Sequence, residues 1–357
     1  MRFTLHPTTL KLSKMKNHKR DLVILFLAAY SVMVAQTGEI KSKEFFTDER
    51  TLEVKLSTDI KKLAADKKSM AGINGTFSCK FPDSSIIEET VLLKPRGIFR
   101  KEHCYLASLM VHFNVNKTSK LAPLKKLKMV GGCGKNWDDE QFLLKEYLIY
   151  KMYNLLTDFS FRVRLMKVNY EDTKGKVKPY SQYAFVIEDI DQLAKRNKYQ
   201  KKELIKFGPN GTNRNQTLLM SVFQYMIGNT DWSIPYYHNI KLVVPKSDTN
   251  ALPIPIAYDF DVSGLVNPPY ATPPPDLGIE RVTDRLFRGY APPMEELQPV
   301  IDLFLQKEKN IFSLVNNCSL LNQRTKKDMN SFVEDFYTII KDKSDVKNVF
   351  ITNARRN

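Results

Sequence analysis

Several signatures of familiar enzyme classes are missing from this sequence. Of its five histidines, the three that follow residue 35 (His103, His112 and His238) lack the spacing of zinc ligands. There is no Gly-x-Ser-x-Gly elbow, so a hydrolase triad has no support. The segment ending in Lys135 resembles a phosphate loop, but Met129 replaces its first glycine and Asn136 its final hydroxyl residue. Zinc enzymes, serine hydrolases and P-loop enzymes are therefore disfavoured.

Long apolar runs are also scarce. Near the start, four basic residues between positions 14 and 20 precede an apolar run at 22–30, and Met33-Val34-Ala35 is a plausible cleavage site. We therefore expect a signal peptide over residues 1–35 and a secreted or periplasmic protein of the cell envelope. The run is shorter than the roughly 20 residues of a spanning helix. No later stretch is long enough either, so we expect no transmembrane helix after the leader.

The charge balance is basic, with a formal net charge of +16. Residues 1–35 contribute six Lys or Arg and one Asp, which leaves +11 for the remainder. Such an excess can steer a protein toward acidic polymers, nucleotides or membrane surfaces. The alternative is a solvated basic surface, because the lysines are scattered. No specific nucleic-acid motif accompanies the charge.

Cysteine is rare, with four residues at Cys79, Cys104, Cys133 and Cys318. An even number in an exported chain permits disulfides. We expect Cys104 to pair with Cys133, because each ends or begins a strand-like segment in the same half of the chain. Buried free thiols are the alternative.

The order of elements indicates a change of character near residue 190. Residues 37–84 are polar and lysine-rich, and 40–71 are expected to be partly helical or mobile. Strand-like segments follow at 90–99, 109–115 and 124–130, then a helix at 139–156 and strands at 161–170 and 183–188. Beyond residue 190 we expect helices at 215–227, 294–310 and 327–341, strands near 240–244 and 253–258, an ordered proline-rich loop at 267–276, and a frayed tail after Lys341.

The helix at 139–156 is apolar on two opposite sides, which predicts burial on both. Glu146 lies within its second apolar stripe. A buried carboxylate needs a partner, because an unpaired buried charge is costly. The sequence therefore predicts a basic side chain close to Glu146, for structure or for catalysis.

Asp231, Asn239, Asp259 and Asp261 form the constellation most suggestive of chemistry. They follow a helix, a loop and an apolar strand in turn. Phosphoryl transfer uses such a set: one Asp orients the attacking hydroxyl, and an amide oxygen and a second Asp hold Mg²⁺ or Mn²⁺. Turn formation and local capping are the alternative roles for these residue types.

The Asp-Trp at 231, the His-Asn at 238 and the Tyr-Asp-Phe-Asp at 258, in this order, resemble the spore-coat CotH kinase-like family. Upstream, Lys94-Pro-Arg-Gly-Ile-Phe-Arg100 is similar to that family's Arg-Gly loop, and residues 144–150 resemble its first-lobe helix. The resemblance covers about residues 88–265. The whole chain looks closer to exported bacterial members than to the spore-coat ones.

This resemblance implies an α+β, two-lobed protein-kinase-like fold. A small antiparallel sheet plus a helix would form the first lobe (88–190), and a mainly helical second lobe would span 191–345. An N-terminal polar extension (36–87) would precede them, and a tail (346–357) would follow.

The resemblance also assigns roles. Asp231 would be the catalytic Asp, Asn239 and Asp259 metal ligands, and Asp261 a further candidate ligand. Glu146 would pair with a phosphate-contacting lysine, for which Lys128 is our choice and Lys126 the second. Arg96 and Arg100 would clamp phosphate.

The implied activity is transfer of phosphate from ATP to a protein hydroxyl, with Mg²⁺ or Mn²⁺. Two departures keep alternatives open: the loop between Asp231 and Asn239 is longer than in ordinary protein kinases, and the candidate phosphate loop offers only Gly97. An inactive pseudokinase that acts as a binding or surface-assembly module is one alternative. A transferase that uses another donor is another. The partner in each case would be a protein substrate or a surface partner that the sequence does not identify.

Overall fold

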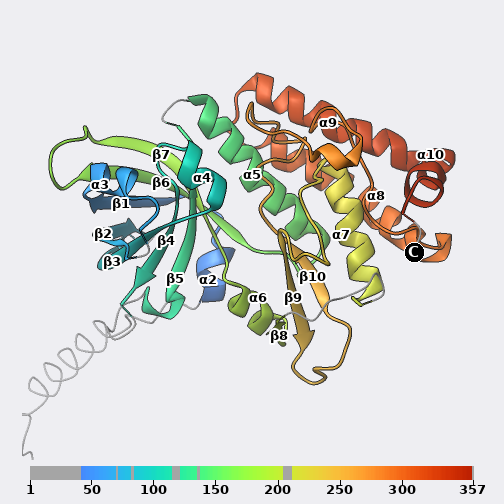
Figure 1. Cartoon of the computed structure of the whole chain (residues 1–357), viewed down its shortest axis with the longest axis horizontal. Helices are drawn as coiled ribbons and strands as arrows, with labels where there is room; N and C mark the ends of the chain where they lie inside the picture. Colours follow the sequence, from blue (N-terminus) through green and yellow to red (C-terminus); the bar gives the residue numbers. More distant parts are fainter. Residues whose placement is uncertain are drawn as a thin grey trace, which may run out of the picture. The chain divides into compact units, whose positions relative to one another are not determined.

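Seven strands close into a mixed β-barrel in the first part of the chain (Figure 1). The computed structural model describes residues 42–69, 71–81, 84–114, 121–134, 137–203 and 211–355. Around the barrel the strands follow the order β1-β2-β3-β4-β5-β7-β6. Their bounds are β1 Leu52–Thr58, β2 Ile73–Lys80, β3 Ile86–Arg96, β4 Ser108–Phe113, β5 Lys126–Gly131, β6 Val163–Asp172 and β7 Tyr180–Ile187. The expected leader at residues 1–35 lies outside the described residues.

Strand β1 closes the barrel. It runs antiparallel to β2 and parallel to β6, with Val54 opposite Val168. Its Leu52, Val54 and Leu56 are buried, whereas the intervening Glu53 and Lys55 are exposed. This alternation is the pattern of a strand with one buried face, and the apolar residues fill the barrel interior.

The expected protein-kinase-like fold is therefore wrong. That expectation placed a small antiparallel sheet in a first lobe beginning at residue 88. Instead, residues 52–80 supply β1 and β2, and the parallel pairing of β1 with β6 turns the sheet into a closed barrel. Closure leaves this sheet without an open edge. The protein is an α+β protein with a seven-stranded mixed barrel, a small three-stranded sheet and C-terminal helices.

Helix α5 (Trp137–Leu156) matches the expected helix at 139–156, and it is buried on two sides as its apolar stripes predicted. It contacts β6 and β7 of the barrel and also α8 (Met294–Asn316). Its apolar residues belong to the larger core, which it shares with α7 (Arg214–Met226) and α9 (Gln323–Lys341). Two charged residues of α5, Lys145 and Glu146, are therefore buried within packed protein.

The small sheet has the order β10-β9-β8, from β8 (Tyr199–Lys202), β9 (Ile240–Pro245) and β10 (Ile254–Ala257). Both of its strand pairs, β10 with β9 and β9 with β8, are antiparallel. The remaining short elements are α2 (Ser42–Thr47), α3 (Ile60–Ala65), α4 (Ile98–His103), α6 (Ile190–Arg196), α10 (Lys343–Lys347), 3-10 turns at Ala122–Leu124 and Pro275–Leu277, and a π-helical turn at Asn348–Thr352.

The C-terminal segment is ordered, contrary to the expected frayed tail. Phe350 is fully buried and packs edge-on against Tyr225 and Phe287. Arg355 pairs with Tyr290 through an isolated β-bridge. The buried Phe350 ring anchors this segment to the core, although most of the surrounding sequence is charged or polar. Across the described ranges, we find no helix with the length and apolarity of a membrane span.

Candidate functional site

The loop after α7 places Asp231 beside His238. Helix α7 is followed by Gly228, whose φ of 63° is a left-handed conformation that glycine adopts readily. The Asn229 side chain then accepts a hydrogen bond from the Asp231 backbone N–H at 3.0 Å. Ser233 and His238 exchange two backbone hydrogen bonds of 3.0 Å each, so the chain folds back on itself. This reversal returns His238 and Asn239 to Asp231.

Both oxygens of the Asp231 carboxylate are engaged. Oδ1 lies 2.6 Å from Nε2 of His238, and Oδ2 accepts a hydrogen bond of 2.9 Å from the Asn239 amide. The same amide donates to the Asp231 backbone carbonyl at 2.8 Å. Asn239 is buried, whereas Asp231 and His238 remain partly accessible to solvent. The carboxylate is thus held in one orientation but can still reach a ligand.

The small sheet brings Asp259 next to Asn239. Strands β9 and β10 pair so that Ile240 faces Ala257, and Tyr258 donates its backbone N–H to the Asn239 carbonyl at 3.1 Å. Asn239 and Asp259 therefore lie at the same end of this pair. Both have positive φ, 54° and 66°, which Asn and Asp tolerate better than most residues. The two segments that the sequence separates by twenty residues meet here.

Phe260 fixes the segment that carries the two aspartates. It is fully buried between α5 and α7, where it contacts Tyr150 and Phe223 with ring centroids 4.7 and 5.7 Å apart. Tyr150 also accepts a hydrogen bond of 2.9 Å from the Asp259 backbone N–H. Because Phe260 is anchored in the core, its neighbours Asp259 and Asp261 are left at the surface of that core.

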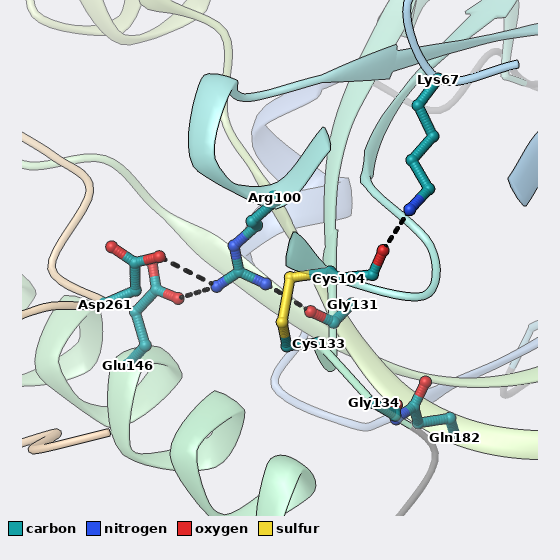
Figure 2. The surroundings of a disulfide bond; sticks show 9 residues. All are labelled: Lys67, Arg100, Cys104, Gly131, Cys133, Gly134, Glu146, Gln182 and Asp261. Atoms are coloured by element: carbon teal, nitrogen blue, oxygen red, sulfur yellow. Dashed lines mark hydrogen bonds and ion pairs between the residues drawn. A yellow bond between two sulfur atoms is a disulfide. The ribbon is translucent and has the colours of Figure 1, made fainter. Parts of the chain in front are cut away.

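Arg100 joins the barrel side to the helices. One of its nitrogens, Nη2, lies 3.4 Å from the Glu146 carboxylate and 3.3 Å from that of Asp261 (Figure 2). Its Nη1 donates a hydrogen bond of 2.6 Å to the Gly131 carbonyl. Glu146 does have a basic partner, as expected, but this partner is Arg100. Lys128 instead lies 3.7 Å from Asp189, and Lys126 pairs with the same residue at 3.4 Å.

We refer to Glu146, Asp259 and Asp261 as the acidic cluster. Burial, and then the charge of Asp261, raise the pKa of Glu146 well above its ordinary value. The same two causes raise the pKa of Asp259 to about 6, although Asp259 keeps contact with solvent and the charges of Arg100 and Arg96 oppose the shift. Because burial and the charge of Asp261 disfavour the ionised forms of these acids, a cation bound beside the acidic cluster would favour ionisation.

Cys104 and Cys133 form a disulfide, as the sequence predicted. Cys104 directly follows α4, the short helix that carries Arg100, and Cys133 follows β5 by two residues. Tyr105 donates its backbone N–H to the Cys133 carbonyl at 2.9 Å, and Lys67 hydrogen-bonds the Cys104 carbonyl (Figure 2). The disulfide thus ties the end of α4 to the strand whose last residue, Gly131, accepts the Arg100 bond.

Arg96 ends β3 close to the acidic cluster. Its charge acts on both Glu146 and Asp259, but it has no carboxylate within ion-pair distance among the described residues. Its charge also acts on Lys128, whose pKa burial lowers. Arg96 is therefore a cation whose guanidinium is available to a ligand, whereas Arg100 is committed to the protein.

The side chains available as ligands determine whether the expected Mg²⁺ or Mn²⁺ could be bound, and how. In the part of the chain that the structure describes, no three His, Cys, Asp or Glu side chains are grouped closely enough to hold a metal ion. Mg²⁺ is often bound by only one or two carboxylates, with water and substrate phosphates completing its shell. Asp259, which forms no ion pair among the described residues, and the Asn239 amide at the same end of the small sheet fit a cation bound in that way and not in a prebuilt cage.

A cavity of about 520 Å³ opens on another side of Asp231. Its volume lies within the 300–1,000 Å³ that is usual for small-ligand sites. Asp231 and His238 line the cavity, the proline-rich loop contributes Pro274, Asp276 and Leu277, and Arg288 and Arg355 add positive charge. Asp259 and Asp261 do not line it. Asp231 therefore lines this cavity, and its charge also acts on Asp259 of the acidic cluster.

Sequence reasoning missed His238 and Tyr150 as parts of this site. His238 directly precedes Asn239, so the fold-back that carries one also carries the other. Tyr150 lies four residues after Glu146 on α5, and residues at that spacing share a helix face. No protein-family model matches this chain, and no curated protein is significantly similar to it.

Proposed function

We propose that this protein transfers a phosphate group from ATP to a protein hydroxyl, with Asp231 orienting the hydroxyl and receiving its proton. The observation that carries the proposal is the position of Asp231, which His238 and Asn239 hold at a cavity wall while its charge still reaches Asp259. A carboxylate in one fixed orientation beside a ligand-sized cavity suits a general base.

Asn239 and Asp259 are the residues that would hold Mg²⁺ or Mn²⁺, and Asp261 is the third candidate, although its carboxylate also pairs with Arg100. A bound divalent cation would offset the charge on the transferred phosphate. Arg96, with no carboxylate partner among the described residues, would hold a phosphate oxygen. Glu146, Arg100 and Lys128 contribute through their charges, because their side chains are engaged by other protein groups.

Export is part of the proposal. The Cys104–Cys133 disulfide is typical of an oxidising compartment, and the first 35 residues have the pattern of a leader. The acceptor would then be a secreted or surface protein.

The direct test is transfer of labelled phosphate by the purified protein with ATP and either Mg²⁺ or Mn²⁺. Asp231→Asn should reduce transfer by roughly 10²–10⁴-fold, the usual contribution of a general base. Asp259→Asn should abolish metal-dependent nucleotide binding. Asp248→Asn, in the exposed turn between β9 and β10, is the matched control and should transfer at the wild-type rate. If neither metal supports nucleotide binding or transfer, the proposal fails.

Binding without transfer is the second candidate function. The candidate phosphate loop favours it, because its single glycine, Gly97, offers little backbone with which to hold a phosphate for transfer. Nucleotide binding that survives Asp231→Asn, with no transfer by the wild type under either metal, would select this function.

A further inference from the structure

The cavity beside Asp231 has a wall whose positive charge the phosphate-transfer proposal does not use. Arg288 donates hydrogen bonds through Nη1 to the backbone carbonyls of Thr230 and Trp232, the residues on either side of Asp231. Its other guanidinium nitrogens have no hydrogen-bond partner among the described residues, and Nε is buried. The guanidinium is therefore fixed at the cavity wall, next to the segment that carries Asp231.

Arg355 adds a second guanidinium to the same wall. Its backbone carbonyl accepts a hydrogen bond of 2.9 Å from Ala291, and its bridge to Tyr290 places it beside the segment that contains Arg288. Neither arginine has a carboxylate within ion-pair distance in the described part of the chain. Burial, and then the charge of Arg355, lower the pKa of Arg288, and Asp276 and Asp231 oppose this shift. An anion between the two arginines would relieve their repulsion.

The rim of the cavity is aromatic. Tyr236 is 87% exposed and Tyr290 is 37% exposed, and both line the cavity. Exposed tyrosines are enriched where proteins bind other polypeptides, because they offer apolar area and a hydrogen bond at little entropic cost. A ligand that fills the cavity and also covers this rim extends beyond a small molecule.

From these contacts we infer that the cavity binds an extended polypeptide segment in which an acidic residue lies close to the acceptor hydroxyl. The inference rests on the proposed function for the position of the hydroxyl at Asp231. The acidic residue would occupy the wall formed by Arg288 and Arg355, which selects acceptors by charge as oppositely charged surfaces do.

The test measures binding in the absence of ATP and metal, so that its result is independent of transfer. The chain has two tryptophans, and Trp137→Phe leaves Trp232, which lines the cavity, as the only fluorophore of this kind. A serine peptide flanked by glutamates should change Trp232 fluorescence and saturate. The same peptide with lysines in place of the glutamates should bind much more weakly.

Three variants in this background complete the test. Arg355→Gln should weaken binding of the acidic peptide by roughly two- to fivefold, as expected for one exposed charge pair. Arg324→Gln, which removes an equal charge from α9, should leave it unchanged. Arg355→Glu should shift the preference toward the lysine peptide, a gain that misfolding cannot produce.

The inference is overturned if the lysine peptide binds as tightly as the acidic one, or if Arg355→Gln and Arg324→Gln behave alike. Should the acidic peptide bind as expected while transfer is absent under both metals, the subsite stands and the proposed transfer fails. Should transfer occur without any preference for acidic peptides, the proposed transfer stands and the acidic subsite fails.

Discussion

Arg100 forms ion pairs with two carboxylates at once, and the charge balance of the acidic cluster depends on it. Its side chain and that of Glu146 are both largely buried. Burial by itself favours loss of the Arg100 proton, but the charges of Asp261 and Glu146 outweigh it and raise its pKa. Removal of the arginine would leave both acids without an ion-pair partner among the described residues.

Arg100→Met should therefore lower the free energy of unfolding by roughly 3–5 kcal/mol, the usual cost of leaving a buried charge unpaired. Urea denaturation at neutral pH measures it. Glu146→Gln should recover part of the loss when combined with Arg100→Met, because the buried acid is then gone. Additive effects of the two substitutions would contradict the pairing.

The raised pKa of Asp259 predicts a pH dependence of stability. The folded pKa of about 6 lies above the unfolded value of about 3.9. The native state therefore holds this proton more tightly, and the contribution of Asp259 to stability falls as the pH rises from about 4 to 6. Asp259→Asn should lack this contribution.

Melting temperatures of the metal-free wild type and of Asp259→Asn, measured from pH 4 to pH 7, provide the test. The variant should gain stability relative to the wild type as the pH rises through this window. Two curves that run parallel would show that the pKa of Asp259 is not raised.

At the scale of single residues, the acids of the cluster could be identified from the sequence, but Arg100 as their basic partner could not. Glu146 is visible as an acid within an apolar stripe, so its need for a cation follows from local pattern. Lys128 was preferred because its strand-like segment, 127–130, leads toward the helix that carries Glu146, while Arg100 was expected to lie just beyond a strand at 90–99. The strand ends at Arg96, and Gly97, with φ of 81°, turns the chain into α4. That turn carries Arg100 to Glu146, and no local pattern in the sequence shows it.

At the scale of elements, the disulfide ties α4 to the end of β5. Helix α4 has only six residues and buries no apolar side chain, so its own contacts hold it weakly. Cys104 and Cys133 lie 29 positions apart in the sequence, and the disulfide closes the loop between them. The pairing was predictable from the two flanking strands, whereas its role in placing Arg100 depends on the unpredicted helix.

Replacement of both Cys104 and Cys133 by Ala should lower the free energy of unfolding by about 2–4 kcal/mol. It should also reduce phosphate transfer, if transfer occurs, because α4 is no longer tied beside the acidic cluster. Urea denaturation with and without a reductant measures the first effect. Cys318→Ser, which removes a free thiol, is the control and should leave the response to reductant intact.

At the scale of the whole molecule, the decisive feature is the closure of the barrel by β1. The motifs that resemble the kinase-like family lie between residues 88 and 265, so they say nothing of β1 or β2. The signal was nevertheless present in the sequence, since Leu52, Val54 and Leu56 alternate with polar residues. Its parallel partner, β6, lies more than a hundred residues away, and a pairing of that separation cannot be read from local pattern.

Closure predicts that residues 52–58 are indispensable. Leu56 is fully buried in the barrel core, so Leu56→Ala should lower the free energy of unfolding by about 2–5 kcal/mol. Glu53→Ala, on the exposed face of the same strand, should change it by no more than about 0.5 kcal/mol. Deletion of all residues up to and including Thr58 should lower the free energy of unfolding by more than Leu56→Ala does. Without β1, strands β2 and β6 would each lose a neighbour and expose an unpaired edge. We expect such a chain to aggregate or to show rapid amide hydrogen exchange throughout the barrel. If the deletion variant instead keeps wild-type exchange protection in β6, β1 is a dispensable extension.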